Sequence, residues 1–362
     1  MEKYLKSLLI IFVLAFATFS SVLGTKVLSE ERITTDPDRQ EYPAIYGDIV
    51  VWQNNIYGTS DIYGYNLKTG QEFQITDSGY AGYPAIYGDI VVWQDDRNEY
   101  TTGADIYGYN LKTGQEFPIC TKDGEQVSPA IYGDIVVWED DRNEYTTGAD
   151  IYGYNLKTGQ EFQICTKNGE QYFPAIYGDI VVWQDDRNKQ WDIYGYNLKT
   201  KQEFPICTED RDQGFPAIYG DIVVWQDDIN NEDEDYSSES SDIYGYNLKT
   251  KQEFPICTED RGQGFPAIYG DIVVWQDDRN KQWDIYGYNL KTKQEFQITT
   301  NTANQKYPAI YCDRVVWHDD RNESDTRTDI YIAYLDVVCE TAKKSLPMDW
   351  ILKILKSNKD KE

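Results

Sequence analysis

The sequence predicts an all-β protein, a seven-bladed β-propeller with four antiparallel strands in each blade. Four short segments rich in β-branched and aromatic residues follow one another within a repeated unit, and turn residues separate them. The seventh unit lacks its fourth segment, and a matching segment precedes the first unit. The string Pro-Ala-Ile-Tyr marks the seven units, at intervals of 41 to 50 residues, and begins at Pro43, Pro84, Pro129, Pro174, Pro216, Pro266 and Pro308.

The second unit illustrates the order of the elements. Its expected strands cover residues 84–87, 90–93, 105–109 and 115–119. Gly88 and Asp89 suit a tight hairpin with a positive φ between the first two strands, and residues 112–114 suit one between the last two. We therefore expect an antiparallel meander in each unit.

The two ends of the chain predict that the ring of blades is closed. The seventh unit stops after its third strand, at residues 329–335. Residues 32–35, Arg-Ile-Thr-Thr, match residues 297–300, Gln-Ile-Thr-Thr, which precede the seventh unit. We expect an N-terminal strand to complete the last blade. A solenoid is the alternative, but it would need atypical capping repeats at both ends.

The N-terminal residues have the layout of a secretory signal peptide. Lys3 and Lys6 precede an apolar run over residues 8–19, and cleavage is expected after Gly24. An uncleaved membrane anchor is the alternative, but the run is shorter than the roughly 20 residues that cross a bilayer. No second long apolar stretch follows, so we expect no transmembrane segment in the mature chain. The expected location is secreted or cell surface.

Three parts of the chain are therefore expected. They are a signal peptide over residues 1–24, the propeller over residues 25–336 and a C-terminal tail over residues 337–362. Trp350 and Ile354 belong to an apolar stripe at helical spacing, which predicts a short amphipathic helix in the tail. This helix either docks on the propeller or contacts a partner or a membrane surface.

Charge and composition exclude several classes of function. The chain has 34 Lys and Arg against 62 Asp and Glu, a formal net charge of −28. Phosphate backbones and anionic lipids repel such a protein, so we expect no nucleic-acid partner. The only histidine is His318, which rules out chemistry based on clustered imidazoles. We expect a monomer.

One face of the propeller carries nearly all of the variation in unit length. Between the second-strand Trp and the Asp of Asp-Ile-Tyr, 8 to 16 residues intervene. This loop and the crossover to the next blade lie on the same face, and loops on a rigid scaffold commonly carry binding sites. We call this face the loop face and expect the ligand there. The second-strand tryptophans are instead expected to pack between blades, at Trp52, Trp93, Trp138, Trp183, Trp225, Trp275 and Trp317.

Two further tryptophans are candidate binding anchors. Trp191 and Trp283 lie in the variable loops of units four and six. A bulky aromatic residue there is either an anchor for a ligand or a cover over its own blade. The secondary candidate ligand contacts are His318 and the loop arginines Arg97, Arg142, Arg187, Arg279 and Arg321.

Asp-Asp-Arg-Asn recurs in five of the variable loops. Its carboxylates could bind Ca²⁺. The spacing does not match a known calcium loop, and we favour a structural role in which Arg and Asn bind neighbouring carboxylates and backbone groups. We expect no cofactor. Unit five replaces the cluster and carries an acidic insertion over residues 231–241, which is expected to be solvated.

Two covalent modifications are predicted. Cys312 replaces the turn glycine of unit seven and Cys339 follows the third strand of that unit, so a disulfide between them is geometrically feasible. Asn322 begins an Asn-Glu-Ser sequon in the variable loop of unit seven, which predicts an N-linked glycan. The remaining cysteines lie in successive fourth strands, too far apart to pair, so free thiols are expected at Cys120, Cys165, Cys207 and Cys257.

The repeat resembles a known family. Pro at a strand start, a hydrophobic second strand, Asp-Asp-Arg-Asn, Asp-Ile-Tyr and a final Ile-Thr are similar to the TolB-type propeller repeat, especially that of archaeal cell-surface proteins. The resemblance covers about residues 32–336 and implies a propeller in a cell-surface context. This chain has Tyr-Gly-Asp where TolB-type repeats usually carry Ser-Pro-Asp-Gly.

These observations favour a non-catalytic extracellular or cell-surface module that binds a protein or a glycan of the cell envelope, or has a structural role there. The sequence has no G-x-S-x-G nucleophile motif and no sialidase-like Asp boxes, and one histidine cannot form the metal cluster of a TolB-type lyase. The alternative is a polysaccharide-active enzyme, a glycosidase or lyase, that uses carboxylates on the loop face.

Overall fold

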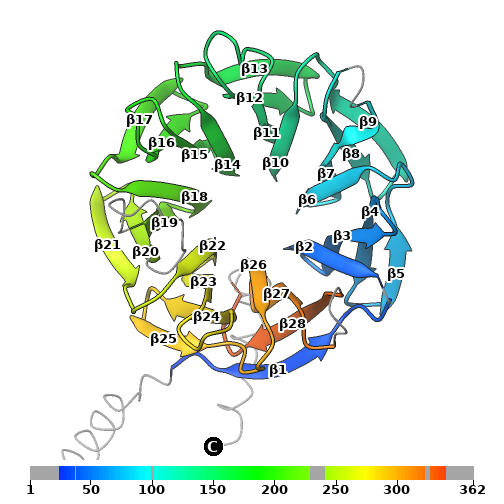
Figure 1. The fold of residues 1–362 in the computed structure, drawn as a ribbon, viewed down its shortest axis with the longest axis vertical. Helices are drawn as coiled ribbons and strands as arrows, with labels where there is room; N and C mark the ends of the chain where they lie inside the picture. The colour runs from blue at the N-terminus through cyan, green and yellow to red at the C-terminus, as the bar shows by residue number, and fades with distance from the viewer. Residues whose placement is uncertain (1–23, 37, 99–101, 229–240, 323–326, 340–362) are drawn as a thin grey trace, which may run out of the picture.

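The computed structural model describes residues 24–36, 38–98, 102–228, 241–322 and 327–339. Seven four-stranded antiparallel sheets surround a central axis (Figure 1), which confirms the predicted propeller. From the axis outward, blades one to three contain β2 (Arg39–Tyr46), β3 (Ile49–Ile56), β4 (Thr59–Asn66) and β5 (Gln71–Gln74); β6 (Ala81–Tyr87), β7 (Ile90–Asp95), β8 (Asp105–Asn110) and β9 (Gln115–Cys120); β10 (Gln126–Tyr132), β11 (Ile135–Asp140), β12 (Asp150–Asn155) and β13 (Gln160–Cys165).

The remaining blades repeat this order. Blades four to six contain β14 (Gln171–Tyr177), β15 (Ile180–Asp185), β16 (Asp192–Asn197) and β17 (Gln202–Cys207); β18 (Asp212–Tyr219), β19 (Ile222–Asp228), β20 (Ser241–Asn247) and β21 (Gln252–Cys257); β22 (Gln263–Tyr269), β23 (Ile272–Asp277), β24 (Asp284–Asn289) and β25 (Gln294–Gln297). Blade seven contains β26 (Gln305–Tyr311), β27 (Arg314–Asp319), β28 (Asp329–Leu335) and β1 (Val27–Arg32). A short 3₁₀ helix, η1 (Asp96–Asn98), follows β7.

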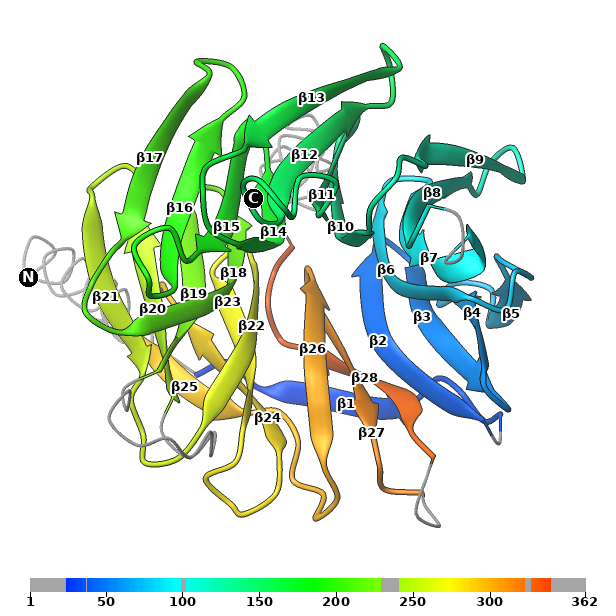
Figure 2. The same ribbon diagram turned by 45° about the horizontal axis from the view of Figure 1, so that its top comes forward.

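The N-terminal strand closes the ring as predicted. β1 pairs antiparallel with β28 at the outer edge of blade seven (Figures 1 and 2). Just beyond β1, the backbone N–H of Ile330 donates to Thr34 Oγ1 at 2.9 Å. Thr76 and Thr299 accept the equivalent hydrogen bonds in blades one and six, at 2.9 and 2.8 Å. Residues 32–35 therefore take the place of a fourth-strand end, as their match to residues 297–300 indicates.

The second-strand tryptophans form the contacts between blades. All seven are at most 1% exposed, as expected for a packing role. Trp93 of blade two, for example, packs against Val51 and Ile62 of blade one. Its indole N–H donates to Asp95 Oδ2 at 3.0 Å, so the polar edge of the ring is paired inside the protein. Each such ring removes on the order of 200 Å² of surface from water, which holds neighbouring blades together.

Each first strand begins three or four residues before its proline and contains a bulge. In β6, the pairing with β7 shifts between Gly82 and Ala85, which leaves Tyr83 and Pro84 outside the regular ladder. Proline has no N–H to donate, and the residue before it has a φ of 50°. The same register shift occurs in the first strand of all seven blades. The prediction from the sequence started each first strand at its proline and did not include this bulge.

The turns between first and second strands are tight, as predicted. Gly88 has a φ of 61°, a left-handed conformation that glycine adopts without a Cβ clash. Cys312 occupies this position in blade seven with a φ of 63°. It forms a disulfide with Cys339, and the two Cα atoms are 5.1 Å apart.

Several predictions concern segments that the structure does not describe. Residues 1–23, 229–240 and 340–362 lie outside the described residues, so the signal peptide, the solvated acidic insertion and the amphipathic C-terminal helix stay predictions. Within the described ranges, no helix combines the length and apolar character needed to cross a membrane.

Candidate ligand-binding site

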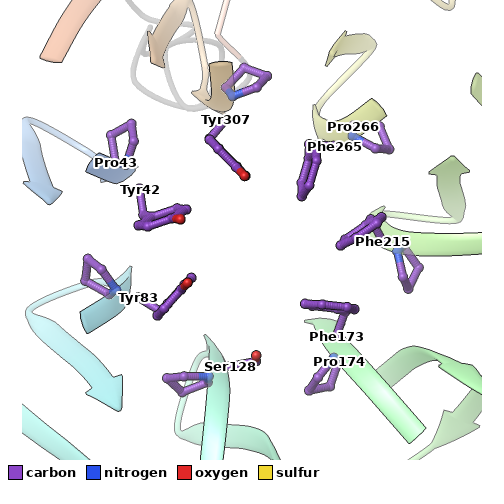
Figure 3. A pocket seen from close by; sticks show the side chains of 14 residues that line it. Tyr42, Pro43, Tyr83, Ser128, Phe173, Pro174, Phe215, Phe265, Pro266 and Tyr307 are labelled. Carbon is purple, nitrogen blue, oxygen red and sulfur yellow. The ribbon is translucent and has the colours of Figure 1, made fainter. Parts of the chain in front are cut away.

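The residues before the seven prolines gather around the propeller axis. With the prolines, they line a cavity of about 330 Å³, which we call the axial cup (Figure 3). Each has a φ between 50° and 52°, although none is glycine. Such residues are uncommon, and when they recur they often mark functional sites. The seven cup residues are Tyr42, Tyr83, Ser128, Phe173, Phe215, Phe265 and Tyr307.

A side chain of the preceding blade holds most of these strained residues in place. The backbone N–H of Phe215 donates to Gln184 Oε1 at 3.0 Å, and that of Tyr307 donates to Gln276 Oε1 at 3.0 Å. The N–H groups of Tyr83, Ser128 and Phe173 make the equivalent bonds to the second strands before them, at 3.3, 3.1 and 2.6 Å. These bonds satisfy donors that the bulge removes from the sheet and connect each cup residue to its neighbouring blade.

Six aromatic rings form an open arc in the cup. Their neighbouring centroids are 4.4 to 4.9 Å apart, from Tyr83 through Tyr42, Tyr307, Phe265 and Phe215 to Phe173. Ser128 of blade three lies between the two ends of the arc (Figure 3). The two end rings are the exposed ones, since Tyr83 is 45% and Phe173 is 38% exposed. We call the space above Ser128 between these two rings the slot.

The arc has a polar half and an apolar half. Tyr307, Tyr42 and Tyr83 lie on one side, and their hydroxyls point into the opening (Figure 3). Burial raises the pKa of Tyr42, and a hydrogen bond to Tyr83 adds to this shift. The other side presents only phenyl rings. The cup therefore offers hydrogen-bonding groups and an apolar wall to the same ligand.

The opposite end of the axis carries an unbroken ring of tyrosines. These residues end the first strands, next to the tight turns, and their neighbouring centroids are 4.6 to 4.8 Å apart. The cup lies toward the other end of the first strands, because Gln126 near Ser128 pairs with Asp140, where the variable loop begins. The cup thus belongs to the loop face. The tyrosines of the closed ring are Tyr46, Tyr87, Tyr132, Tyr177, Tyr219, Tyr269 and Tyr311.

Blade three contains a buried carboxylate next to the slot. Glu139 of β11 occupies the position that is Gln in blades one, two, four, five and six. It is 6% exposed. Its Oε1 accepts the N–H of Phe173 at 2.6 Å, and the Ser128 side chain also hydrogen bonds to it. Burial raises the pKa of Glu139 to about 7, because the two hydrogen bonds offset only part of the desolvation.

His318 occupies this second-strand position in blade seven. It is 4% exposed, and its ring centroid lies 5.0 Å from Tyr307 and 6.2 Å from Tyr42. Burial lowers its pKa to about 3, so the ring is neutral at physiological pH. His318 is thus buried against two cup tyrosines, and its role as a ligand contact stays a prediction.

The predicted anchors lie in loops outside the lining of the cup, and Tyr172 contacts both the Trp191 ring and the cup residue Phe173. The Trp191 ring is half-buried, with its centroid 5.4 Å from that of Tyr172 in the same blade. Its backbone N–H donates to Asp212 Oδ1 at 2.9 Å. Trp283 is also half-buried, and its N–H donates to Asn304 Oδ1 at 3.2 Å. Neither tryptophan lines the axial cup.

The loop arginines bind buried aspartates within their own blades. In blade three, Arg142 Nε donates to Asp140 Oδ1 at 2.7 Å, and Nη1 donates to Glu161 Oε1 at 2.8 Å. The guanidinium carbon lies 4.2 Å from the ring centroid of Tyr152. These contacts support the structural interpretation of Asp-Asp-Arg-Asn. Ion pairs of the same kind occur at Arg97, Arg187, Arg279 and Arg321.

Among the described residues, no group of three or more His, Cys, Asp or Glu side chains is placed to hold a metal ion.

The four cysteines expected to be free form no disulfide and are buried, and burial raises the pKa of the Cys120 and Cys165 thiols to about 12. Asn322 donates from Nδ2 to Asp329 Oδ2 at 3.1 Å, and residues 323–324 of its sequon lie outside the described ranges. The N-linked glycan stays a prediction.

Sequence reasoning missed the axial cup, although a signal was present. Pro-Ala-Ile-Tyr is identical in all seven units, and the residue before it is Tyr, Tyr, Ser, Phe, Phe, Phe and Tyr in turn. An aromatic residue at one fixed position of six copies, and serine in the seventh, is the pattern that the bulge converts into an open arc.

Comparison with known proteins supports the fold. The chain matches no family model and no curated protein. Its structure is similar to that of oligogalacturonate lyase from Vibrio parahaemolyticus, with 15% identity and a TM-score of 0.64 over 86% of this chain and 98% of that chain. It is also similar to the β-propeller domain of the Trilobed protease from Pyrococcus furiosus, with 15% identity and a TM-score of 0.61 over 83% of this chain and 94% of that chain.

TolB-like propellers are also among the similar structures. The structure of putative TolB from Agrobacterium tumefaciens has 17% identity and a TM-score of 0.49 over 64% of this chain and 85% of that chain. The resemblance to archaeal cell-surface proteins stays an expectation. At 15% identity, the oligogalacturonate lyase and the propeller domain of the protease share the fold of this chain, and a shared fold does not decide whether this chain is an enzyme.

Proposed function

We propose that this protein is a non-catalytic binding module that takes its ligand in the axial cup. The cup itself carries this proposal, because its seven residues keep positive φ angles and leave apolar rings open to solvent. Strained backbone and an exposed aromatic patch are both unfavourable for a purely structural element, and together they indicate a binding surface. The rigid ring of blades presents the cup without a conformational change.

The proposed location is outside the cell, secreted or at the cell surface. The signal-like pattern of residues 1–24 supports this location. The disulfide between Cys312 and Cys339 adds support, because such bonds persist mainly in oxidising compartments. A ligand of the cell envelope is then the natural candidate.

The geometry of the cup favours a protein ligand over a glycan. Sugars bind aromatic residues by stacking on an open ring face, but four of the six rings have an aromatic neighbour on both sides. What remains accessible is a narrow opening of hydroxyls and ring edges. A side chain projecting from a partner protein matches this opening better than a flat sugar surface does.

Envelope fractions provide the test. The purified protein should retain an envelope component that the double variant Phe215→Ala/Phe265→Ala loses, because this change removes two of the three phenyl rings in the apolar half of the cup. Trp191→Ala is the matched control, since Trp191 is an aromatic residue of the loop face outside the cup. Loss of binding in Trp191→Ala with retention in the double variant would place the site in the variable loops instead.

A carbohydrate-active enzyme is the second candidate, and one observation favours it. Glu139, Glu125, Asp141, Glu144 and Glu170 line a cavity of about 160 Å³ between blades three and four. A carboxyl group with a pKa near 7 is suited to general acid catalysis. Incubation with oligogalacturonate and envelope polysaccharides should yield no product under our proposal. Product that disappears in Glu139→Gln would establish the enzyme.

A further inference from the structure

Blade three departs from the other blades at two positions that touch each other. It has Ser128 where every other blade has an aromatic cup residue, and Glu139 where no other blade has a carboxylate. The Ser128 side chain hydrogen bonds to Glu139. The blade that lacks a cup ring is thus also the blade with a carboxylate at this second-strand position, and both positions lie next to the slot.

The slot is the one position of the cup that lacks an aromatic ring. Around the arc, each neighbouring pair of blades brings two rings into contact at 4.4 to 4.9 Å. Among the described aromatic contacts with other cup residues, Tyr83 touches only Tyr42 and Phe173 touches only Phe215. These two end rings are also the most exposed of the six. A flat group above Ser128 would complete the ring of seven.

The electrostatics of the slot favour a cation. Among the described residues, the hydrogen-bond partners of Glu139 are the Phe173 N–H and Ser128, which are both neutral. A buried carboxylate without a counter-charge destabilises the protein when it ionises, so a cation that reaches it gains a strong attraction. The net charge of −28 also attracts a cationic ligand from a distance.

We propose that the slot binds the guanidinium group of an arginine side chain presented by a partner protein. This inference rests on the proposed function of the axial cup. A guanidinium is planar, stacks on aromatic faces and carries five N–H donors. Tyr83 and Phe173 would flank its plane, and Ser128, which lines the cup, would accept a hydrogen bond from it. Glu139, which is hydrogen bonded to the Ser128 side chain, would supply the counter-charge from behind Ser128. Its aliphatic stem would lie along the phenyl rings of Phe173 and Phe215.

Other side chains satisfy only part of this chemistry. A phenyl group would fill the slot but leave the Glu139 carboxylate without a counter-charge. A lysine ammonium would supply charge but has no plane to fill the space between Tyr83 and Phe173. The combination of one vacant ring position with one carboxylate is therefore specific for a planar cation.

Small amides of single amino acids test the proposal directly. We would titrate the purified protein with Nα-acetyl-arginine amide and measure affinity by calorimetry or ligand-observed NMR. The citrulline amide has the same shape without the charge, and the lysine amide has the charge without the plane. We expect the arginine probe to bind about tenfold more tightly than either, the difference expected of one charge-assisted contact. Equal affinity for arginine and citrulline, or no binding of the arginine probe, would overturn the proposal.

Two variants locate the interaction. Glu139→Gln should reduce affinity for the arginine probe about tenfold and leave that for citrulline nearly unchanged. Ser128→Phe should abolish binding of the probe because it fills the slot, and its backbone tolerates phenylalanine at the same φ as Phe173. Both variants should keep a cooperative unfolding transition. Undiminished arginine binding in either folded variant would refute the slot as the site.

A matched control separates the slot from general charge. Gln184→Glu places a carboxylate at the equivalent position of blade four, where the neighbouring cup rings are in contact. It should not increase affinity for the arginine probe, and an increase would mean that charge alone explains binding. Failure of the arginine probe is distinguishable from failure of the binding module, since an envelope ligand lost in Phe215→Ala/Phe265→Ala would still support the cup.

Discussion

Replacing Glu139 by glutamine should stabilise the protein at neutral and alkaline pH but not at acidic pH. Gln184 and Gln276 show that glutamine fits this position, since both accept the N–H of the next cup residue at 3.0 Å through Oε1. The substitution Glu139→Gln therefore keeps the hydrogen bond to Phe173 and removes only the ability to ionise.

The magnitude follows from the pKa of Glu139. Burial raises it from 4.5 to about 7, and one pKa unit corresponds to about 1.4 kcal/mol, so ionisation costs the folded protein about 3 kcal/mol. Below pH 4.5, both the folded and the unfolded chain hold the proton and the cost is absent. As pH rises from 4.5 to 7, the unfolded chain releases the proton before the folded chain does, so the free energy of unfolding of the wild type falls. Above pH 7 this fall is complete.

Urea unfolding of the wild type and Glu139→Gln at several pH values measures this effect. The variant should be more stable by about 3 kcal/mol at pH 8 and equally stable near pH 4, because the difference between the two proteins cancels all other titrating groups. The reverse substitution, Gln184→Glu, should destabilise the protein at pH 8. A pH-independent difference, or a less stable Glu139→Gln at pH 8, would refute the reasoning.

Three further outcomes are expected. Deletion of residues 25–36 removes β1 and opens the ring, so cooperative thermal stability should fall strongly, and an unchanged melting transition would argue against closure. Arg142→Ala leaves Asp140 buried and unpaired, so denaturant unfolding should reveal a loss of about 3–5 kcal/mol, whereas a loss near zero would mean that the ion pair is not needed. Mass spectrometry after alkylation without reduction should find four reactive thiols in the unfolded chain, with Cys312 and Cys339 blocked; six reactive thiols would contradict the disulfide.

The sequence predicts those features that repeat with fixed spacing. The strands, the tryptophan contacts between blades and the closing strand all follow from residues that recur at constant distances within each unit. Thr34 illustrates this, because its match to Thr299 predicts the hydrogen bond that it accepts. The pairing of Arg142 with Asp140 was one of two interpretations, and the structure shows the contacts that decide it.

The axial cup was not predictable in the same way. Its geometry depends on a bulge that strand patterns do not reveal, and on hydrogen bonds between different blades. Phe173 and Glu139, for example, are 34 residues apart and meet only when blade four packs on blade three. Loop length drew the prediction to the variable loops, whereas the cup residues stand at a fixed position, directly before each Pro-Ala-Ile-Tyr, and differ only in side-chain type.

The pairing of β1 with β28 in blade seven determines when during folding the ring of blades can close. Val27 of β1 pairs with Leu335 of β28, so β1 must wait for a strand that is synthesised about 300 residues later. Each of blades one to six is formed by four consecutive strands and can assemble during synthesis, whereas blade seven cannot. β1, with the sequence Val-Leu-Ser-Glu-Glu-Arg, lacks the Gln-Glu-Phe start of the other outer strands, so the strand that completes the ring differs in sequence from the strands that complete the other six blades.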